Sequence, residues 1–125
     1  MTRQSAGKSG ASRYHAGRAA EEIAERAYAD RGGRILARRW RCQEGEIDLV
    51  IALGSLIAFV EVKLCRKMTP DSPVRPRQWQ RIAAAASRWL AERPEQPAAC
   101  RFDAAIVGAT GALTLIENAH VDGLA

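Results

Sequence analysis

The chain has 125 residues, 47% of them hydrophobic and 26% charged, and a formal net charge of +5, which suits one globular domain with one core. No apolar run approaches the roughly 20 residues that cross a bilayer, and the basic N-terminus lacks the apolar segment of a secretory signal. We therefore expect a cytoplasmic protein that does not bind membranes. The three cysteines form no CxxC pair, which argues against a disulfide framework and a structural zinc site.

Residues 1–15 are rich in Gly, Ser and Ala, carry basic side chains and show no periodicity, which predicts a flexible basic tail. The remaining residues, 16–125, are predicted to form one domain. From Gly17 onward, apolar residues recur at three- and four-residue steps as far as Tyr28, which predicts an amphipathic helix. Gly32-Gly33 is predicted to end this helix.

Three strands are predicted next, over residues 34–42, 46–53 and 56–64, with a tight turn at Gly54-Ser55 between the second and third. In the second strand, alternation predicts one face made of Ile47, Leu49 and Ile51, and an opposite face made of Glu46, Asp48 and Val50. The third strand is largely apolar on both faces, which is typical of a central strand covered on both sides.

Residues 66–76 hold three prolines and predict a loop, and apolar residues from Trp79 to Leu90 then repeat at helical spacing. Two short strands follow, at 101–108 and 112–117. The order αβββαββ predicts an α/β fold with a mixed β-sheet flanked by helices. We expect Trp79 and Trp89 to pack in the core and the cysteines to be small buried hydrophobic residues.

Three charged residues lie within these apolar strands: Asp48 in the second, and Glu61 and Lys63 in the third. A buried charge is costly unless it is paired or bound to a metal. The predicted hairpin would place Asp48 beside Glu61, and two adjacent carboxylates repel each other unless a cation lies between them. An all-oxygen site of this kind suits Mg²⁺ or Mn²⁺, and a neighbouring lysine suits phosphodiester hydrolysis. The alternative is a buried ion pair with no metal.

The spacing of Asp48 and Glu61-Val62-Lys63 resembles the D…(D/E)xK signature of the PD-(D/E)XK nuclease superfamily. The segments GEIDLV at 45–50 and FVEVK at 59–63 are more specific and resemble the YraN family, small proteins similar in fold to archaeal Holliday-junction resolvases. The resemblance also includes AEEIA at 20–24, and it spans about residues 17 to 120. It implies a restriction-endonuclease-like core, so that residues 16–125 would form a PD-(D/E)XK nuclease-like domain.

The resemblance also implies roles for individual residues. Asp48 and Glu61 correspond to the metal ligands, the carbonyl of Val62 to a further ligand, and Lys63 to the catalytic lysine. Glu21, on the first helix, corresponds to an acidic residue that contacts the metal or its waters, and it completes the predicted catalytic set.

Basic residues near this site are candidates for binding the nucleic-acid backbone, because each arginine or lysine placed on a phosphate releases counterions. One set is the run Arg38, Arg39 and Arg41 on the first strand, where the alternative is a solvated edge strand. The other set flanks the loop after the third strand and comprises Arg66, Lys67, Arg75 and Arg77. Gln78 joins them through the family resemblance, as a polar residue near the active face.

These patterns together predict a Mg²⁺- or Mn²⁺-dependent endonuclease that hydrolyses phosphodiester bonds in DNA, with branched or structured DNA as one candidate substrate. The rival hypothesis is a nucleic-acid-binding module with a nuclease-like fold and little or no cleavage activity of its own. A homodimer would suit cleavage of both strands of a junction, but the sequence leaves the oligomeric state open. Asp103 is predicted to form a structural ion pair or hydrogen bond with Arg101.

Overall fold

The computed structural model describes residues 2–65 and 74–120, with side chains described from residue 16 onward. Its elements follow the predicted order, and the α/β fold class with a mixed sheet and two flanking helices is confirmed. The elements are α1 (Thr2–Asp30), β1 (Arg34–Arg41), β2 (Glu46–Leu53), β3 (Leu56–Leu64), α2 (Pro76–Ala91), β4 (Ala99–Val107) and β5 (Leu113–His120).

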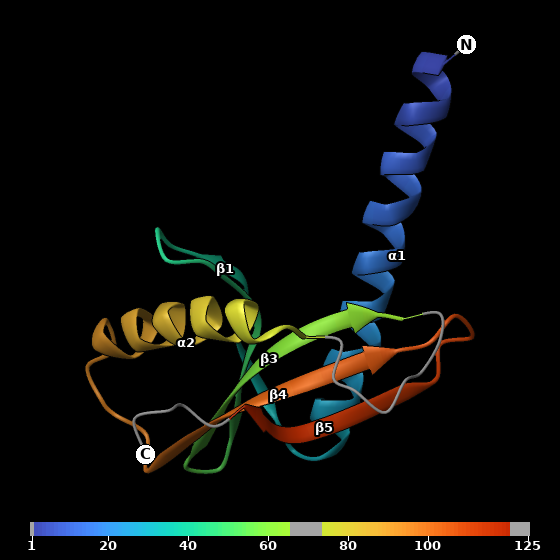
Figure 1. The fold of residues 1–125 in the computed structure, drawn as a ribbon. Coiled ribbons are helices and arrows are strands. Elements are labelled where there is room, and N and C mark those ends of the chain that lie inside the picture. The colour runs from blue at the N-terminus through green and yellow to red at the C-terminus, as the bar shows by residue number, and fades with distance from the viewer. Residues whose placement is uncertain (1, 66–73, 121–125) are drawn as a thin grey trace.

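The five strands form one sheet in the order β1-β2-β3-β4-β5 (Figure 1). Strands β1, β2 and β3 are antiparallel neighbours, and Gly54, with φ of 61°, lies in the tight turn between β2 and β3. Strand β4 lies parallel to β3, because the chain passes through α2 between them, and β5 returns antiparallel to β4. Strand β3 is therefore the central strand, as its apolar faces predicted.

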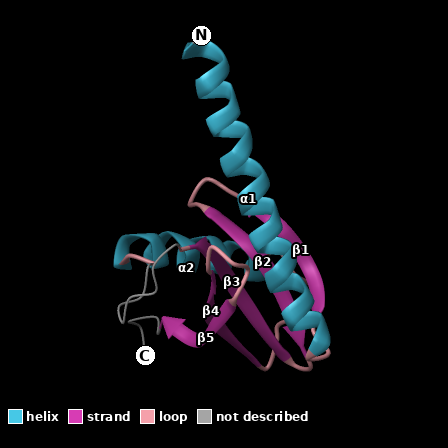
Figure 2. Cartoon of the chain, turned by 90° about the vertical axis from the view of Figure 1, so that its right-hand side faces the viewer, coloured by secondary structure: helices cyan, strands magenta, loops and turns pink. Residues whose placement is uncertain are grey.

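The two helices cover opposite faces of the sheet, so the protein has two apolar clusters (Figure 2). The α1-side cluster packs α1 on the sheet and contains Ala24, Tyr28, Leu49, Ile51, Ala58, Val60 and Ala105. The α2-side cluster is larger and richer in aromatic residues, and its principal members are Ile47, Val50, Phe59, Trp79, Ile82, Trp89 and Phe102. Both tryptophans of α2 are buried in the core, as the helical spacing predicted.

Helix α1 is longer than predicted. Its backbone is helical from Thr2, so residues expected to be a flexible tail continue the helix, and this part of α1 extends away from the sheet (Figure 1). Alanine, a strong helix former, recurs in this segment. The helix was not predicted because the segment has no apolar stripe. The division of the chain into a tail and a domain stays a prediction. Neither helix, over the described residues, has the length and apolar character needed to cross a bilayer.

Two smaller predictions were also wrong. Pro76 was assigned to a loop but occupies the first turn of α2. Proline is tolerated there because the N–H that it lacks would have no partner in the helix. Residues 66–73 of the predicted loop lie outside the described residues. None of the three cysteines forms a disulfide within the described residues, and Cys100 is exposed where a buried residue was expected.

The predicted alternation of β2 fails at one residue. Leu49 and Ile51 belong to the α1-side cluster as predicted, but Ile47 packs in the α2-side cluster with Val50. Opposite this break lies Arg39, which falls between the pairs Arg38↔Leu49 and Trp40↔Ile47 and has φ of 46°, in the left-handed region. Such a conformation is uncommon for arginine, and it marks an irregularity beside the residues predicted to be functional.

Candidate metal and nucleic-acid site

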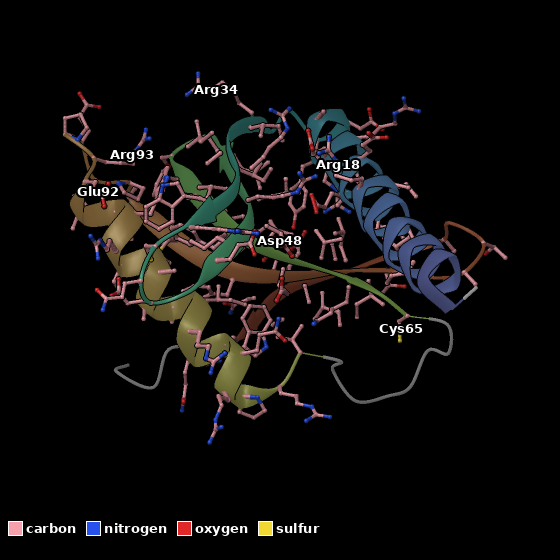
Figure 3. The ribbon with its side chains drawn as sticks, turned by 90° about the horizontal axis from the view of Figure 1, so that it is seen from above. Arg18, Arg34, Asp48, Cys65, Glu92 and Arg93 are labelled. Atoms are coloured by element: carbon pink, nitrogen blue, oxygen red, sulfur yellow. The ribbon has the colours of Figure 1, made fainter. Side chains whose placement is uncertain are left out.

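The candidate site lies where the β2–β3 ladder ends. Backbone pairing extends from Leu53↔Leu56 to Leu49↔Val60, and the same register puts Asp48 opposite Glu61. At this end the backbone N–H of Val62 donates a 2.8 Å hydrogen bond to Oδ2 of Asp48, so a side chain replaces the next backbone acceptor. In Figure 3, Asp48 lies in the region between the two helices. The end of the ladder thereby presents two carboxylates toward α2.

A cavity of about 360 Å³ lies between this end of the hairpin and the first half of α2. The structure brings five of the predicted residues to its wall, Asp48, Glu61, Val62, Lys63 and Gln78. The full lining is Gly45, Glu46, Asp48, Glu61, Val62, Lys63, Gln78, Arg81 and Ile82. The juxtaposition follows from the hairpin register and from the crossover helix, which returns across the face that carries Glu61.

Glu61 is buried, with 6% of its surface exposed, and the amide Nε2 of Gln78 donates a hydrogen bond to its Oε2. Burial raises the pKa of Glu61 to about 9, assisted by hydrogen bonding to Asp48 and by repulsion from the Asp48 charge, while Lys63 opposes the shift. With this pKa, Glu61 holds its proton at neutral pH when no cation is bound. A cation between them would replace that proton and relieve the repulsion.

The donor set fits a hard divalent cation. Within the described residues no group of three or more Asp, Glu, His or Cys side chains could hold a metal, so the site offers two carboxylates and the nearby carbonyl of Val62. Mg²⁺ binds in this way, because it dehydrates reluctantly and keeps several waters. The bonds from Val62 and Gln78 each use one oxygen of a carboxylate that has two.

Glu21 is placed differently from the other predicted ligands. It comes from α1, does not line the cavity, and accepts a 2.8 Å hydrogen bond from Nε of Arg39. Burial raises the pKa of Glu21, Arg39 counteracts the shift, and the charge of Asp48 adds to it, which shows that Glu21 lies near the site. Its role as a ligand stays a prediction, because this structure pairs it with an arginine.

The predicted basic residues fall into two groups. The three predicted arginines of β1 have acidic partners: the pairs are Arg38–Glu25 at 2.8 Å, Arg39–Glu21 at 2.8 Å and Arg41–Glu46 at 3.3 Å. On the other side, Arg75 and Arg77 are exposed at the start of α2, and no ion pair joins them to a carboxylate of the described chain. Arg66 and Lys67 lie outside the described residues.

Arg81, which was not among the predicted residues, lines the cavity together with Gln78. The two residues are three apart on α2 and therefore share one helix face. This spacing was visible in the sequence, and it becomes informative once Gln78 is assigned to the site.

Asp103 has the structural role that was predicted, with more partners than expected. It is completely buried and accepts hydrogen bonds from Nε of Arg101 at 2.9 Å, from the Tyr28 hydroxyl at 2.7 Å and from the backbone N–H of Asn118 at 2.9 Å. Burial is the main cause that raises the pKa of Tyr28, followed by its hydrogen bond to Asp103. Asp103 thus links α1, β4 and β5 and lies outside the cavity.

Comparison with known proteins gives one family. The model of the uncharacterised protein family UPF0102 matches residues 20–107, a range that includes every residue of the cavity wall. A UPF0102 protein of Cereibacter sphaeroides is 46% identical over 114 residues, covering 89% of this chain and 97% of its own length. One from Ruegeria pomeroyi is 42% identical over 116 residues, covering 91% and 94%. A UPF0102 protein of Frankia alni is 45% identical over 94 residues, covering 73% of this chain and 78% of its own length.

Proposed function

The chain belongs to the UPF0102 family, the YraN family that its sequence resembles, and we propose that it is a Mg²⁺- or Mn²⁺-dependent endonuclease that hydrolyses phosphodiester bonds in DNA. We further propose that its hairpin and crossover helix form a PD-(D/E)XK nuclease core, with branched or structured DNA as a candidate substrate. The observation that carries the proposal is the pair of adjacent carboxylates, Asp48 and Glu61, at the end of an apolar hairpin and on the wall of a cavity.

The cost of this pair supports a function beyond folding. A buried carboxylate that faces a second carboxylate loses hydration and gains repulsion, and an apolar residue of similar volume would avoid both. Lys63 is in the same cavity and lowers the pKa of Glu61, but it does not restore that pKa to the ordinary range. The site is thus pre-arranged for a further positive charge.

The residues around the cavity would have different roles in the reaction. Asp48, Glu61 and the Val62 carbonyl would hold the cation, which supplies Lewis-acid activation of a water and of a phosphoryl oxygen when it is bound. The ammonium of Lys63 would orient the attacking water and stabilise the negative charge that develops on the phosphate. Gln78 fixes the orientation of the Glu61 carboxylate by donating to its Oε2.

The charge of the protein supports a polyanionic substrate. The net charge is +5, and arginines without acidic partners in the described chain lie at the start of α2, beside the cavity. Phosphate contacts from such residues supply most of the affinity that a protein has for DNA of any sequence.

Cleavage assays test the proposal directly, with labelled junction, flap, single-stranded and duplex DNA in Mg²⁺ or Mn²⁺. We expect metal-dependent cleavage by the wild type that falls by about a thousandfold or more in Asp48→Asn and Lys63→Ala, the size expected when a group that stabilises the transition state is lost. Glu22→Gln, on the exposed face of α1, is the matched control. Cleavage that persists in Asp48→Asn would rule out this site as the active centre.

A second candidate function is a nucleic-acid-binding module that cleaves little or nothing. It is favoured by Glu21, which pairs with Arg39 instead of lining the cavity. This alternative predicts salt-sensitive DNA binding that is unchanged by Asp48→Asn and is not accompanied by turnover with any divalent ion. The same cleavage assays separate the two functions.

A further inference from the structure

The arginines on the two sides of the cavity differ in their freedom to bind a new anion. Three of the four arginines of β1 form ion pairs with glutamates: Arg38 with Glu25, Arg39 with Glu21 and Arg41 with Glu46. A phosphate would have to compete with each of these carboxylates. Among the described residues, no ion pair joins a carboxylate to Arg75, the N-cap of α2, or to Arg77 and Arg81 in the first half of this helix.

Arg81 is the one arginine of this set that lines the cavity, where it shares the wall with Asp48, Glu61 and Lys63. It is exposed, so its guanidinium is accessible from solvent. Its backbone lies close to Gly45, at the start of β2: a methyl group added at Gly45 would lie 3.2 Å from the Arg81 carbonyl oxygen. This close approach of α2 to the start of β2 fixes where the side chain begins, at the edge of the cavity.

Positive charge lies along the side of α2 that leads from Arg81 toward the N-terminus of the helix. Arg77 is one helical turn earlier, so both side chains lie along the same side of α2. The first turn of α2 has no acidic residue, and its N-cap, Arg75, makes no side-chain capping bond. The partial positive charge of the helix N-terminus therefore adds to the arginine charges.

We infer that Arg81 binds a phosphate of the substrate backbone at the mouth of the cavity, and that the bound strand continues past Arg77 along the first turns of α2 instead of along β1. The inference rests on the proposed function, because the cavity is where the scissile phosphodiester would lie. A planar guanidinium suits this task, since it can donate two parallel hydrogen bonds to one phosphate.

The test is DNA binding measured apart from cleavage, by fluorescence anisotropy with labelled duplex and four-way junction in EDTA over a series of salt concentrations. Arg81→Ala is expected to weaken binding about tenfold, the loss of one charge-assisted hydrogen-bonded contact. It should also reduce the slope of log K against log salt by about one, as for one phosphate contact. Arg81→Lys should restore the slope more than the affinity, because it keeps the charge and loses the bidentate geometry.

Arg88→Ala is the matched control, since Arg88 lies on the same helix, pairs with Glu44 and Glu92 and does not line the cavity. It should bind as the wild type does. Arg38→Ala compares the β1 route and should lose less affinity than Arg81→Ala. Equal binding by Arg81→Ala and Arg88→Ala, or a larger loss in Arg38→Ala, would overturn the inference even if the wild type cleaves DNA. Loss of binding in Arg81→Ala by a protein that never cleaves would support the backbone path and refute the nuclease proposal.

Discussion

Glu61 on β3 and Asp103 on β4 are the buried charged side chains of the described chain, and they lie on neighbouring parallel strands, one residue apart in register. They face opposite sides of the sheet. Asp103 accepts from the Tyr28 hydroxyl, which belongs to the α1-side cluster, whereas Glu61 accepts from Gln78 of α2. The same kind of group is thus buried twice in adjacent strands with different surroundings.

The difference lies in the charges that surround each carboxylate. Asp103 has a cation, a hydroxyl and a backbone N–H as donors, so its negative charge is compensated by the fold itself. Glu61 has one amide donor and faces Asp48, and its pKa rises to about 9. A carboxylate that the fold compensates has a structural role, and one that the fold leaves uncompensated on a cavity wall is available to bind an external cation.

Removing Asp103 is the largest expected change in folding stability. Asp103→Ala should lower the free energy of unfolding by about 3–5 kcal/mol, because it leaves Arg101 and the Tyr28 hydroxyl without their buried acceptor. At pH 5 and without metal, Glu61→Gln should change it by about 1 kcal/mol or less, because Glu61 is then protonated in the fold and the glutamine oxygen can still accept from Gln78. Urea unfolding measures both.

If Asp103→Ala does not fold, Asp103→Asn gives the same comparison at a smaller scale, because the asparagine oxygen keeps one acceptor. A Glu61→Gln variant as unstable as either Asp103 variant would show that Glu61 is a structural residue too. The contrast between the two carboxylates would then be lost.

Divalent ions should stabilise the protein through the carboxylates of Asp48 and Glu61 and not through that of Asp103. At a Mn²⁺ concentration about 100-fold above its Kd, the wild type should gain about 2.7 kcal/mol of stability, seen as a rise in Tm. The gain should disappear in Glu61→Gln and Asp48→Asn, which remove a ligand charge. It should remain in Asp103→Asn, measured from the lower Tm of that variant. A gain that survives in Glu61→Gln would place the ion elsewhere.

The sequence was sufficient to predict the charged residues that meet at the candidate site, but not the contacts around them. The bounds of β2 and β3 were predicted correctly, because their apolar residues are bracketed by Gly45 and by the turn at Gly54. Asp48 and Glu61 were recognisable because charge is rare in such strands. The partners of Asp103 were not recognisable, since Tyr28 is 75 residues away and Asn118 contributes only its backbone.

The arrangement of Ile47 and Arg81 could not be predicted for a related reason. The alternation rule assumes a regular strand, and β2 departs from strict alternation at Ile47. The left-handed backbone of Arg39 on β1 lies opposite this point. Arg81 faces the cavity because of how α2 crosses the hairpin, which is a property of tertiary packing. Local patterns predict elements and unusual residues, whereas the contacts between distant elements decide which of those residues meet.

The smallest expected effect for a single change of condition is that of one pH unit on stability in the absence of metal. The pKa of Glu61 is raised from an ordinary 4.5 to about 9 by folding, so the folded state holds a proton that the unfolded state releases within this window. The stabilising contribution of that proton is complete below pH 4.5 and is lost as the pH rises toward 9, with a slope of at most about 1.4 kcal/mol per pH unit.

Glu61→Gln removes the titrating group, so its stability relative to the wild type should increase from pH 5 to pH 9, the window that the pKa values define. Urea unfolding at a series of pH values in EDTA measures this difference, with Glu22→Gln as the control on the exposed face of α1. A difference that stays constant with pH would mean that Glu61 is ionised in the metal-free fold, and Lys63 would then be the cation that compensates it.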